Sequence, residues 1–139
     1  MIGNKTLTMI KPFAVEKGYI GGILSMINKN GFRIKAMKFL KLSVDQAKAF
    51  YKVHEERPFY NSLVEFMSSG PIVAAILEKE NAIDEYRKLI GATNPENAEL
   101  NTIRNLFGTS LEKNAVHGSD SDENAEIESD FFFSELERY

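Results

Sequence analysis

The segment Asn114-Ala-Val-His-Gly-Ser-Asp-Ser121 holds the residues best suited to chemistry in this sequence. Its histidine, His117, follows a short apolar stretch and precedes Gly118, which opens a polar turn into an expected helix. Helix N-termini attract anions through their free N–H groups and dipole, and neutral imidazole is a good nucleophile near pH 7. The segment therefore predicts a nucleophile beside an anion site. On spacing alone, a lone histidine is more often a structural or surface residue, so this alternative outweighs the nucleophile.

Glu128 is the residue that favours the first interpretation. It follows Ala125 by three residues and precedes Phe132 by four, so it lies on a partly apolar face of the expected last helix. A carboxylate on such a face needs a polar partner, and this helix runs back past the turn that holds His117. We expect Glu128 to meet His117. The alternative is a half-exposed glutamate with no role in chemistry.

The bulk properties describe one globular domain spanning residues 1–139. Hydrophobic residues make up 43% and charged residues 27%, and no cysteine is present, which excludes disulfides and thiolate metal sites. No signal peptide is recognisable after Met1, and the longest apolar run, residues 71–77, is too short to span a bilayer. We therefore expect a cytoplasmic protein with no membrane partner.

Charge is distributed unevenly along the chain. Residues 120–139 contain eight acidic residues and one basic residue, whereas residues 1–119 contain sixteen basic and twelve acidic ones. A solvated acidic helix explains the C-terminal excess. The remaining cations suit an anionic ligand, but they are not clustered as DNA binding requires, so no nucleic-acid partner is expected. No group of Asp, Glu or His has the spacing of a metal cage, so no protein-held metal is expected.

Apolar periodicity predicts strands and helices that alternate along the chain. Strands are expected at residues 5–11, 32–42, 72–77 and 115–117, the second with a bulge or twist near Ala36-Met37. Helices are expected at 20–27, from a Ser43–Gln46 capping box to His54, from Pro58 to Met67, from an Asn81 cap to Ile90, at 102–107 and at 121–133. Strands joined by helices and never by tight hairpins favour a small sheet with helices packed on it.

The segment at residues 114–121 resembles the active-site signature of nucleoside diphosphate kinases, and other segments agree in order along nearly the whole chain. They are Thr8-Met9-Ile10-Lys11-Pro12, Arg57-Pro58-Phe59-Tyr60, Ser69-Gly70-Pro71, Gly91-Ala92-Thr93-Asn94-Pro95, Thr102-Ile103-Arg104 and Glu126-Ile127-Glu128. The resemblance implies a ferredoxin-like α/β (α+β) fold, in which helices pack on an antiparallel sheet in a single domain. It also implies a homo-oligomer, either a tetramer or a hexamer.

The reaction implied by the resemblance is a ping-pong exchange. A nucleoside triphosphate, mainly ATP, phosphorylates His117 through Nδ1, and a second nucleoside diphosphate then collects the group. A phosphoramidate stays reactive enough for this return step. Glu128 would hold the proton on the other ring nitrogen, Ser119 would support that carboxylate, and Tyr51 would lie beside the histidine. The magnesium ion would arrive on the nucleotide and be held mostly by phosphates and water.

The resemblance also assigns residues to the nucleotide. Lys11, Arg87, Thr93 and Arg104 would meet phosphate oxygens, and Lys11 and Asn114 would also approach the ribose hydroxyls. His54 would make a phosphate-side contact, Phe59 would stack on the base, and Leu111 would close its other face. Stacking tolerates any nucleobase. Each residue also has an ordinary alternative: the arginines as exposed helix charges, Lys11 as a strand flank, and Tyr51 and Phe59 as core aromatics.

Three departures from the family pattern stand out. Phe13 replaces the usual acid after Lys-Pro, Leu100-Asn101 replaces Pro-Gly, and Asn105-Leu106 replaces an acid after Arg104. Asn tolerates the left-handed conformation, so the turn at Asn101 can survive. None of the three changes a residue in direct chemistry. They leave loop rigidity and subunit contacts open.

Two other functions remain possible at this level. A nucleotide-sensing module would keep the cationic phosphate contacts with an inert His117, and it would not need Glu128. A phosphocarrier that receives phosphate from a protein would not need Phe59 or the dispersed cations. Phosphorylation of the protein by ATP distinguishes all three functions.

Overall fold

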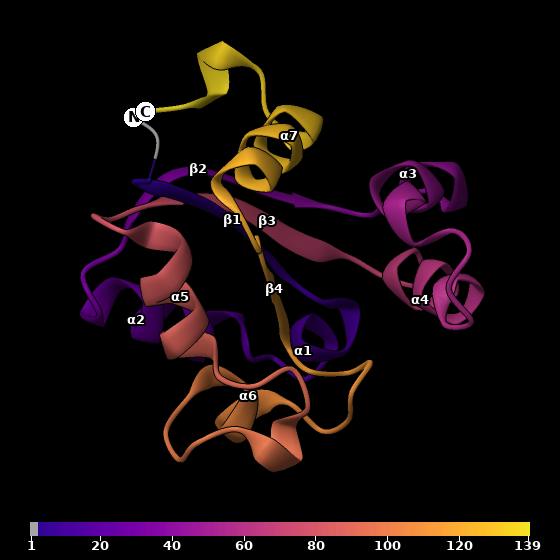
Figure 1. Ribbon diagram of the computed structural model, residues 1–139, viewed down its shortest axis with the longest axis horizontal. Helices are drawn as coiled ribbons and strands as arrows, with labels where there is room; N and C mark the ends of the chain where they lie inside the picture. The colour runs from indigo at the N-terminus through magenta and orange to yellow at the C-terminus, as the bar shows by residue number, and fades with distance from the viewer. Residues whose placement is uncertain (1–2) are drawn as a thin grey trace.

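The computed structural model describes residues 3–139, and it centres on the alternating segment near the N-terminus. This segment forms β1 (Lys5–Ile10) inside an antiparallel sheet with the strand order β2-β3-β1-β4 (Figure 1). The other strands are β2 (Arg33–Leu40), β3 (Ile72–Glu78) and β4 (Val116–Gly118). Side chains alternate between faces along a strand, so Leu7 and Met9 join one apolar cluster and Ile10 joins the other. The ferredoxin-like antiparallel sheet is confirmed.

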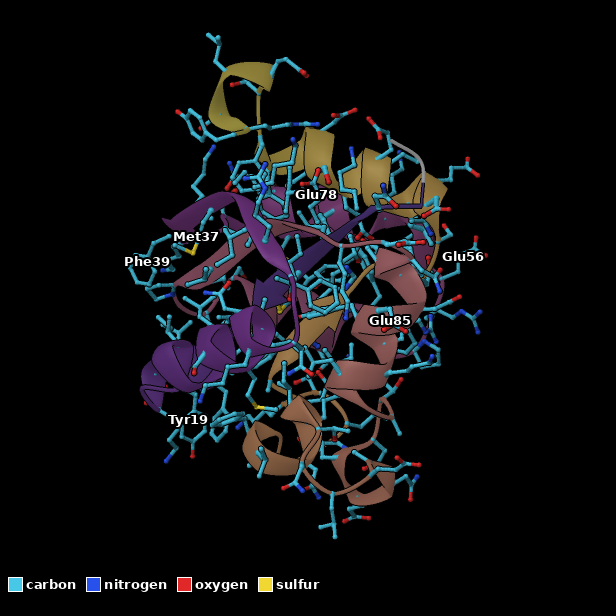
Figure 2. The ribbon with its side chains drawn as sticks, turned by 90° about the vertical axis from the view of Figure 1, so that its left-hand side faces the viewer. Tyr19, Met37, Phe39, Glu56, Glu78 and Glu85 are labelled. Atoms are coloured by element: carbon cyan, nitrogen blue, oxygen red, sulfur yellow. The ribbon has the colours of Figure 1, made fainter. Side chains whose placement is uncertain are left out.

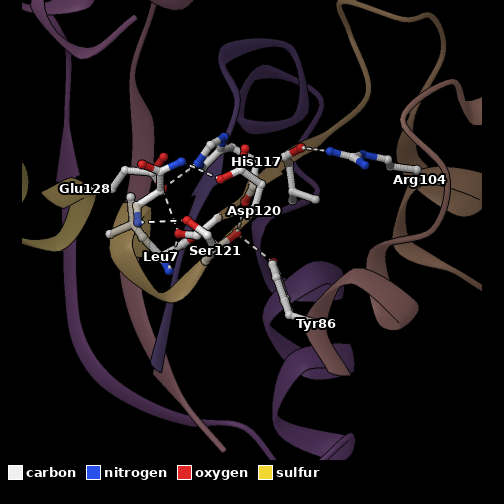
Figure 3. A network of polar contacts seen from close by, with 11 residues as sticks. Leu7, Tyr86, Arg104, His117, Asp120, Ser121 and Glu128 are labelled. Carbon is white, nitrogen blue, oxygen red and sulfur yellow. Dashed lines mark hydrogen bonds and ion pairs between the residues drawn. The ribbon is translucent and has the colours of Figure 1, made fainter. Parts of the chain in front are cut away.

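One face of the sheet is covered by four helices. These are α1 (Pro12–Glu16), α2 (Ile20–Lys29), α5 (Ala82–Ile90) and α6 (Ile103–Phe107). Ile23 and Ile27 of α2 meet the fully buried Tyr86 of α5 in one core cluster, as helical spacing predicts. Tyr86 proves important for the site, because its hydroxyl points toward β1 and β4 (Figure 3).

The other face carries α3 (Val44–Phe50), α4 (Tyr60–Met67) and α7 (Asp122–Phe132). The expected capping box is present at the start of α3: the Gln46 backbone N–H donates to Ser43 Oγ (3.1 Å), and the Ser43 N–H donates to Gln46 Oε1 (2.9 Å). Helices α3 and α4 form a pair that extends from one end of the sheet (Figure 1). Short 3-10 turns follow α3, α5 and α7, at Lys52–His54, Pro95–Asn97 and Glu135–Glu137.

Several predicted element boundaries are wrong. Helix α4 begins at Tyr60 with Phe59 as its N-cap, so Pro58 does not start it. Helix α3 ends at Phe50, and His54 lies in a separate 3-10 turn. The short helix α1 is not among the predicted elements, because five residues are too few to show a helical period.

Backbone details confirm two expectations and correct a third. The register of β2 on β3 shifts between Ile34 and Ala36, which places the bulge at the start of the predicted region. Asn101 has a positive φ of 68°, so asparagine does replace glycine at that turn. Asn81 precedes α5 in a left-handed conformation (φ 57°), and its side chain caps no N–H in the described part of the chain. Within residues 3–139, no helix is long and apolar enough to cross a membrane.

Strand β2 forms an open edge of the sheet. Met37 and Phe39 project from it into solvent, with exposed fractions of 52% and 63% (Figure 2). The C-terminal residue covers part of the same edge, since the Tyr139 backbone N–H donates to the Lys35 carbonyl (2.7 Å) and Arg33 Nη2 donates to the Tyr139 carbonyl (2.9 Å). An exposed apolar edge of this kind favours pairing with another chain.

Candidate active site

His117 is held on β4 at the opposite edge of the sheet from β2. Its backbone pairs with Met9 of β1, and its carbonyl accepts a hydrogen bond from Thr8 Oγ1 (2.8 Å). The Thr8 hydroxyl in turn contacts the Tyr86 hydroxyl at 2.6 Å (Figure 3). Burial raises the pKa of Tyr86 well above its usual value, so this chain of hydroxyls stays neutral. The strand that carries the imidazole is therefore held by β1 and, through the Thr8 hydroxyl, by Tyr86 of α5.

The imidazole itself is oriented by Glu128. His117 Nε2 lies 2.9 Å from Glu128 Oε1, and Ser119 Oγ donates to the same carboxylate oxygen at 2.7 Å. The Leu7 backbone N–H donates to Ser119 Oγ (3.0 Å), which anchors the group to β1. A carboxylate at Nε2 selects the tautomer with the proton there and leaves the Nδ1 lone pair free. The predicted contact between Glu128 and His117 is present.

An aromatic cluster lies next to the imidazole and contacts it through Phe50. The Phe50 ring lies edge-to-face with His117, with ring centroids 5.7 Å apart, and it also contacts Tyr51, Phe131 and Phe132 at 4.9, 5.2 and 5.4 Å. Tyr51 is buried, and burial together with the negative charge of Glu128 raises the pKa of its hydroxyl far above the usual value. The Tyr51 hydroxyl has no hydrogen-bond partner within residues 3–139.

Two buried basic side chains, Arg104 and Lys11, lie close to the strand that carries the histidine. Arg104 of α6 donates to the carbonyls of Gly91 (3.1 Å) and Val116 (2.9 Å), while its buried Nε has no partner among the described residues. Burial and the nearby Arg104 lower the pKa of Lys11 to about 7, although Glu112 opposes this. Burial lowers the pKa of Arg104 to about 10, so it stays protonated at neutral pH. The alternative of an exposed helix charge is wrong for Arg104.

A cavity of about 710 Å³ opens beside Arg104, whereas Lys11 is not among the residues that line it. Arg87, Thr93 and Arg104 line it together with Gly118 and Asp120, which flank the histidine turn. The cavity thus joins three of the expected phosphate contacts to the edge of the histidine segment. Arg87 is exposed, unlike Arg104.

Asn114 connects the loop before β4 to this cavity. Its Nδ2 donates to the Thr93 carbonyl (3.0 Å), and its buried Oδ1 has no partner within the described residues. Among residues 3–139, no group of three or more His, Cys, Asp or Glu could hold a metal ion.

The residues expected around the base lie outside this cavity. Phe59 and Leu111 are 47% and 61% exposed, which excludes the alternative of a core phenylalanine. The ring centroids of His54 and Phe59 lie 5.6 Å apart. His54 lies in the 3-10 turn after α3, and Phe59 is the N-cap of α4, so both belong to the α3–α4 pair that extends from the sheet. Their place beside the cations remains a prediction.

Sequence reasoning missed several residues that support the site. Phe50 falls within the helix predicted to run to His54, and nothing in its spacing distinguishes a contact with His117 from ordinary packing. Thr8 and Tyr86 are separated by 78 residues, so only the folded sheet shows their contact. Ser62 and Glu112 meet at 2.7 Å across 50 residues and had no sequence signal.

Together, the fold and the site define a ferredoxin-like protein with an oriented histidine beside a cationic cavity suited to an anionic substrate. Comparison with known proteins makes this class specific. The model of the nucleoside diphosphate kinase family matches residues 4–138. A nucleoside diphosphate kinase of Flavobacterium psychrophilum is 58% identical over 139 residues and covers all of both chains. That of Lawsonia intracellularis is 58% identical over 133 residues, or 96% of each chain.

Solved structures agree with these sequence matches. The Aquifex aeolicus nucleoside diphosphate kinase superposes with a TM-score of 0.96 at 50% identity, covering 98% of this chain and 99% of its own. A halophilic nucleoside diphosphate kinase of Halobacterium salinarum, solved in complex with CDP, gives a TM-score of 0.94 at 34% identity, covering 99% and 91%. This chain therefore belongs to the nucleoside diphosphate kinase family. It is a phosphotransferase acting on nucleotides, and a ping-pong reaction through a phosphohistidine is general for the family.

Proposed function

We propose that His117 carries the phosphoryl group in a reversible exchange between nucleoside triphosphates, mainly ATP, and nucleoside diphosphates. The observation that supports this most directly is the contact of 2.9 Å between His117 Nε2 and Glu128 Oε1, with Ser119 bonded to the same oxygen. This arrangement leaves Nδ1 as the free nucleophile. It also places a negative charge where positive charge develops on the ring during transfer.

The transfer is a displacement at the terminal phosphorus. The Nδ1 lone pair forms the N–P bond as the bond from phosphorus to the β–γ bridging oxygen breaks, and the diphosphate leaves with that electron pair. Lys11, Arg87 and Arg104 would neutralise the phosphate oxygens, which is the main task in phosphoryl transfer. Thr93 would add a hydroxyl donor. A second diphosphate reverses the step and regenerates the free imidazole.

The nucleoside would bind between the cations and the α3–α4 pair. Phe59 would stack on the base, with Leu111 on its other face, and Lys11 and Asn114 would meet the ribose. The exposure of both apolar side chains supports this, because a base can stack only on a ring face that is accessible from solvent. His54 lies against Phe59 and would reach the phosphate side. The Halobacterium relative was solved with CDP, a nucleoside diphosphate, which is the ligand class proposed here.

The remaining properties follow from the same proposal. Magnesium would be held by the nucleotide phosphates and water, and it would add positive charge at the phosphates. The cavity lining includes Glu99 and Asp120, whose carboxylates could approach such an ion. A homo-oligomer, tetramer or hexamer, is supported by the exposed Met37 and Phe39 on the open β2 edge. Cytoplasmic location stays a prediction.

The experiment is a phosphate-chase assay. The protein is incubated with ATP labelled at the γ-phosphate and with magnesium, and acid-labile label on the protein is measured before and after GDP is added. We expect label on the unmutated protein that moves to GTP, and none on His117→Ala with its fold intact. Exchange by His117→Ala near the normal rate would exclude the proposed carrier. No label on the unmutated protein would favour the sensing module, and label that GDP cannot remove would contradict nucleotide exchange.

A further inference from the structure

The loop that carries Leu111 is a compact turn with its own hydrogen bonds. The Thr109 backbone N–H donates to the Lys113 carbonyl (2.8 Å), and the Lys113 N–H donates to Ser110 Oγ (3.1 Å). These bonds close the loop on itself and leave Leu111 and Glu112 at its tip. The loop can therefore move as one unit unless contacts with other elements hold it.

Two such contacts hold the loop from different elements. Ser62 Oγ of α4 donates to Glu112 Oε2 at 2.7 Å. Lys113 Nζ lies 5.3 Å from the centre of the Phe13 ring in α1, a cation–π contact. Phe13 thus has a structural role at the position where the family usually has an acid.

The contact between Ser62 and Glu112 spans the two sides of the proposed base site. Phe59 precedes Ser62 by three residues, which is about one helical turn, and Leu111 directly precedes Glu112. Both apolar side chains are exposed, at 47% and 61%. A hydrogen bond between their neighbours therefore limits how far the two apolar side chains can separate.

We propose that the Ser62–Glu112 hydrogen bond presets the width of the base site, so that Ser62 and Glu112 are positioning residues for the nucleoside. This inference rests on the proposed function. A loop already held in its bound position loses less conformational entropy when the ligand binds, so the contact strengthens nucleotide binding. The acceptor is a carboxylate, which makes the hydrogen bond stronger than one between neutral groups.

Glu112 also has an electrostatic effect that must be separated from this contact, because its charge raises the pKa of Lys11. Ser62→Ala removes the hydrogen bond and keeps the charge. Glu112→Gln removes the charge and keeps an acceptor of the same size. Ser62 is exposed, so its truncation leaves no unpaired group in the core.

The test measures the Kd of GDP by calorimetry and the Kd of inorganic tripolyphosphate, which has the phosphates but no base. Ser62→Ala is expected to raise the Kd of GDP by about 3- to 10-fold, the effect of one exposed charge-assisted hydrogen bond, and to leave the Kd of tripolyphosphate within twofold. Glu112→Gln is expected to weaken tripolyphosphate binding above pH 7, and to weaken GDP binding by a larger factor, because a neutral amide accepts a weaker hydrogen bond from Ser62. Ser69→Ala is the matched control, since its hydroxyl bonds only to the Phe66 carbonyl in the described structure.

Two results would overturn the inference: an unchanged Kd of GDP in Ser62→Ala, or an equal loss of GDP and tripolyphosphate binding. A single-turnover phosphorylation by saturating ATP separates positioning from chemistry, because Ser62→Ala should slow it much less than it weakens GDP binding. Failure of the proposed function would look different, since the unmutated protein would then exchange no phosphate with GDP.

Discussion

The two sides of His117 differ in how completely their polar groups are paired within the protein. On the Glu128 side, the imidazole, the carboxylate and the Ser119 hydroxyl are joined by contacts of 2.9 Å or less. The other side, the cation side, contains Lys11, Arg104 and Asn114. On this side, Arg104 Nε and Asn114 Oδ1 are buried without a partner in residues 3–139. Burial also lowers the pKa values of Lys11 and Arg104, and each lowering is reinforced by a neighbouring arginine.

This difference indicates on which side of His117 the protein pairs its own polar groups and on which side a ligand would have to pair them. Burying a polar group without a partner costs free energy, and burying a charge costs more. The cation side, with two unpaired atoms and buried charges, therefore carries a larger cost than the Glu128 side, where the Tyr51 hydroxyl also lacks a partner in the described residues. An anion bound on the cation side would relieve its cost by pairing the charges and supplying acceptors. The Glu128 side is preorganised for chemistry, and the cation side is complementary to a ligand.

The largest expected effect concerns the two arginines. Arg87→Ala and Arg104→Ala should each lower the maximal rate by about 10² to 10³, the usual cost of losing one preorganised charge-stabilising donor. Arg87 is exposed, so its loss should change the free energy of unfolding by less than about 0.5 kcal/mol. Arg104 bonds to two carbonyls, so its loss should also cost about 1–3 kcal/mol of stability.

Steady-state rates and urea denaturation of the two variants check this prediction. The structure distinguishes the two arginines, because Arg104 is buried and hydrogen-bonded whereas Arg87 is exposed. Normal rates together with a lower stability would mean that Arg104 is purely structural, and the cation side would lose its proposed role.

The next effect tests the Glu128 side. Glu128→Gln should keep the protein folded and slow phosphorylation of His117 by about 10- to 100-fold, as for carboxylates that orient a histidine elsewhere. Glutamine can still accept from Nε2 and from Ser119, but it contributes no charge. The measurement is a single-turnover time course of phosphohistidine formation at saturating ATP. Equal time courses would mean that the carboxylate only packs against the imidazole.

Whether a feature of the fold or the site can be predicted from the sequence depends on how far apart in the chain the contacting residues are. The strands, the Ser43–Gln46 capping box and the turn at Asn101 follow from local patterns, and the structure confirms them. The contact between His117 and Glu128 was predictable because a short turn and one helix separate them. The resemblance supplied the remaining site residues.

Other features depend on contacts between distant segments. Arg104 is buried where α6 meets β4, and Lys11 is buried at the end of β1, next to the loop before β4. No local pattern in the sequence encodes either burial. The same is true of Phe50, whose ring meets His117 only when α3 packs near the end of the sheet. Sequence periodicity shows which face of a helix is apolar, but not which side chain that face meets.

The third effect is a pH dependence on the cation side. In the free protein Lys11 has a pKa of about 7, so it is mostly neutral above that pH. A bound phosphate favours the charged form, so binding must take up a proton, and affinity falls as pH rises. Between pH 7.5 and 8.5 the Kd of ADP should rise about tenfold. Phosphate ionisation, near pH 6, lies below this window.

Calorimetry in buffers of different ionisation enthalpy checks the proton uptake directly. Lys11→Arg provides the comparison, because arginine stays charged throughout this range and should bind with little pH dependence whatever its absolute affinity. A pH-dependent Kd that persists in Lys11→Arg would assign the titration to another group.

The smallest expected effect concerns Phe50, whose ring packs against the imidazole. Its ring meets His117 edge-to-face at 5.7 Å, and an aromatic pair of this kind contributes about 0.5–1.5 kcal/mol. If that energy holds the imidazole with Nδ1 toward the substrate, Phe50→Leu should slow phosphohistidine formation about 2- to 10-fold. The Kd of ADP should stay unchanged. Phe131→Leu is the matched control, because Phe131 contacts Phe50 and Phe132 but makes no ring contact with His117 in the described structure. Equal slowing in both variants would mean that the cluster acts only through packing, and the orientation of His117 would then rest on Glu128 alone.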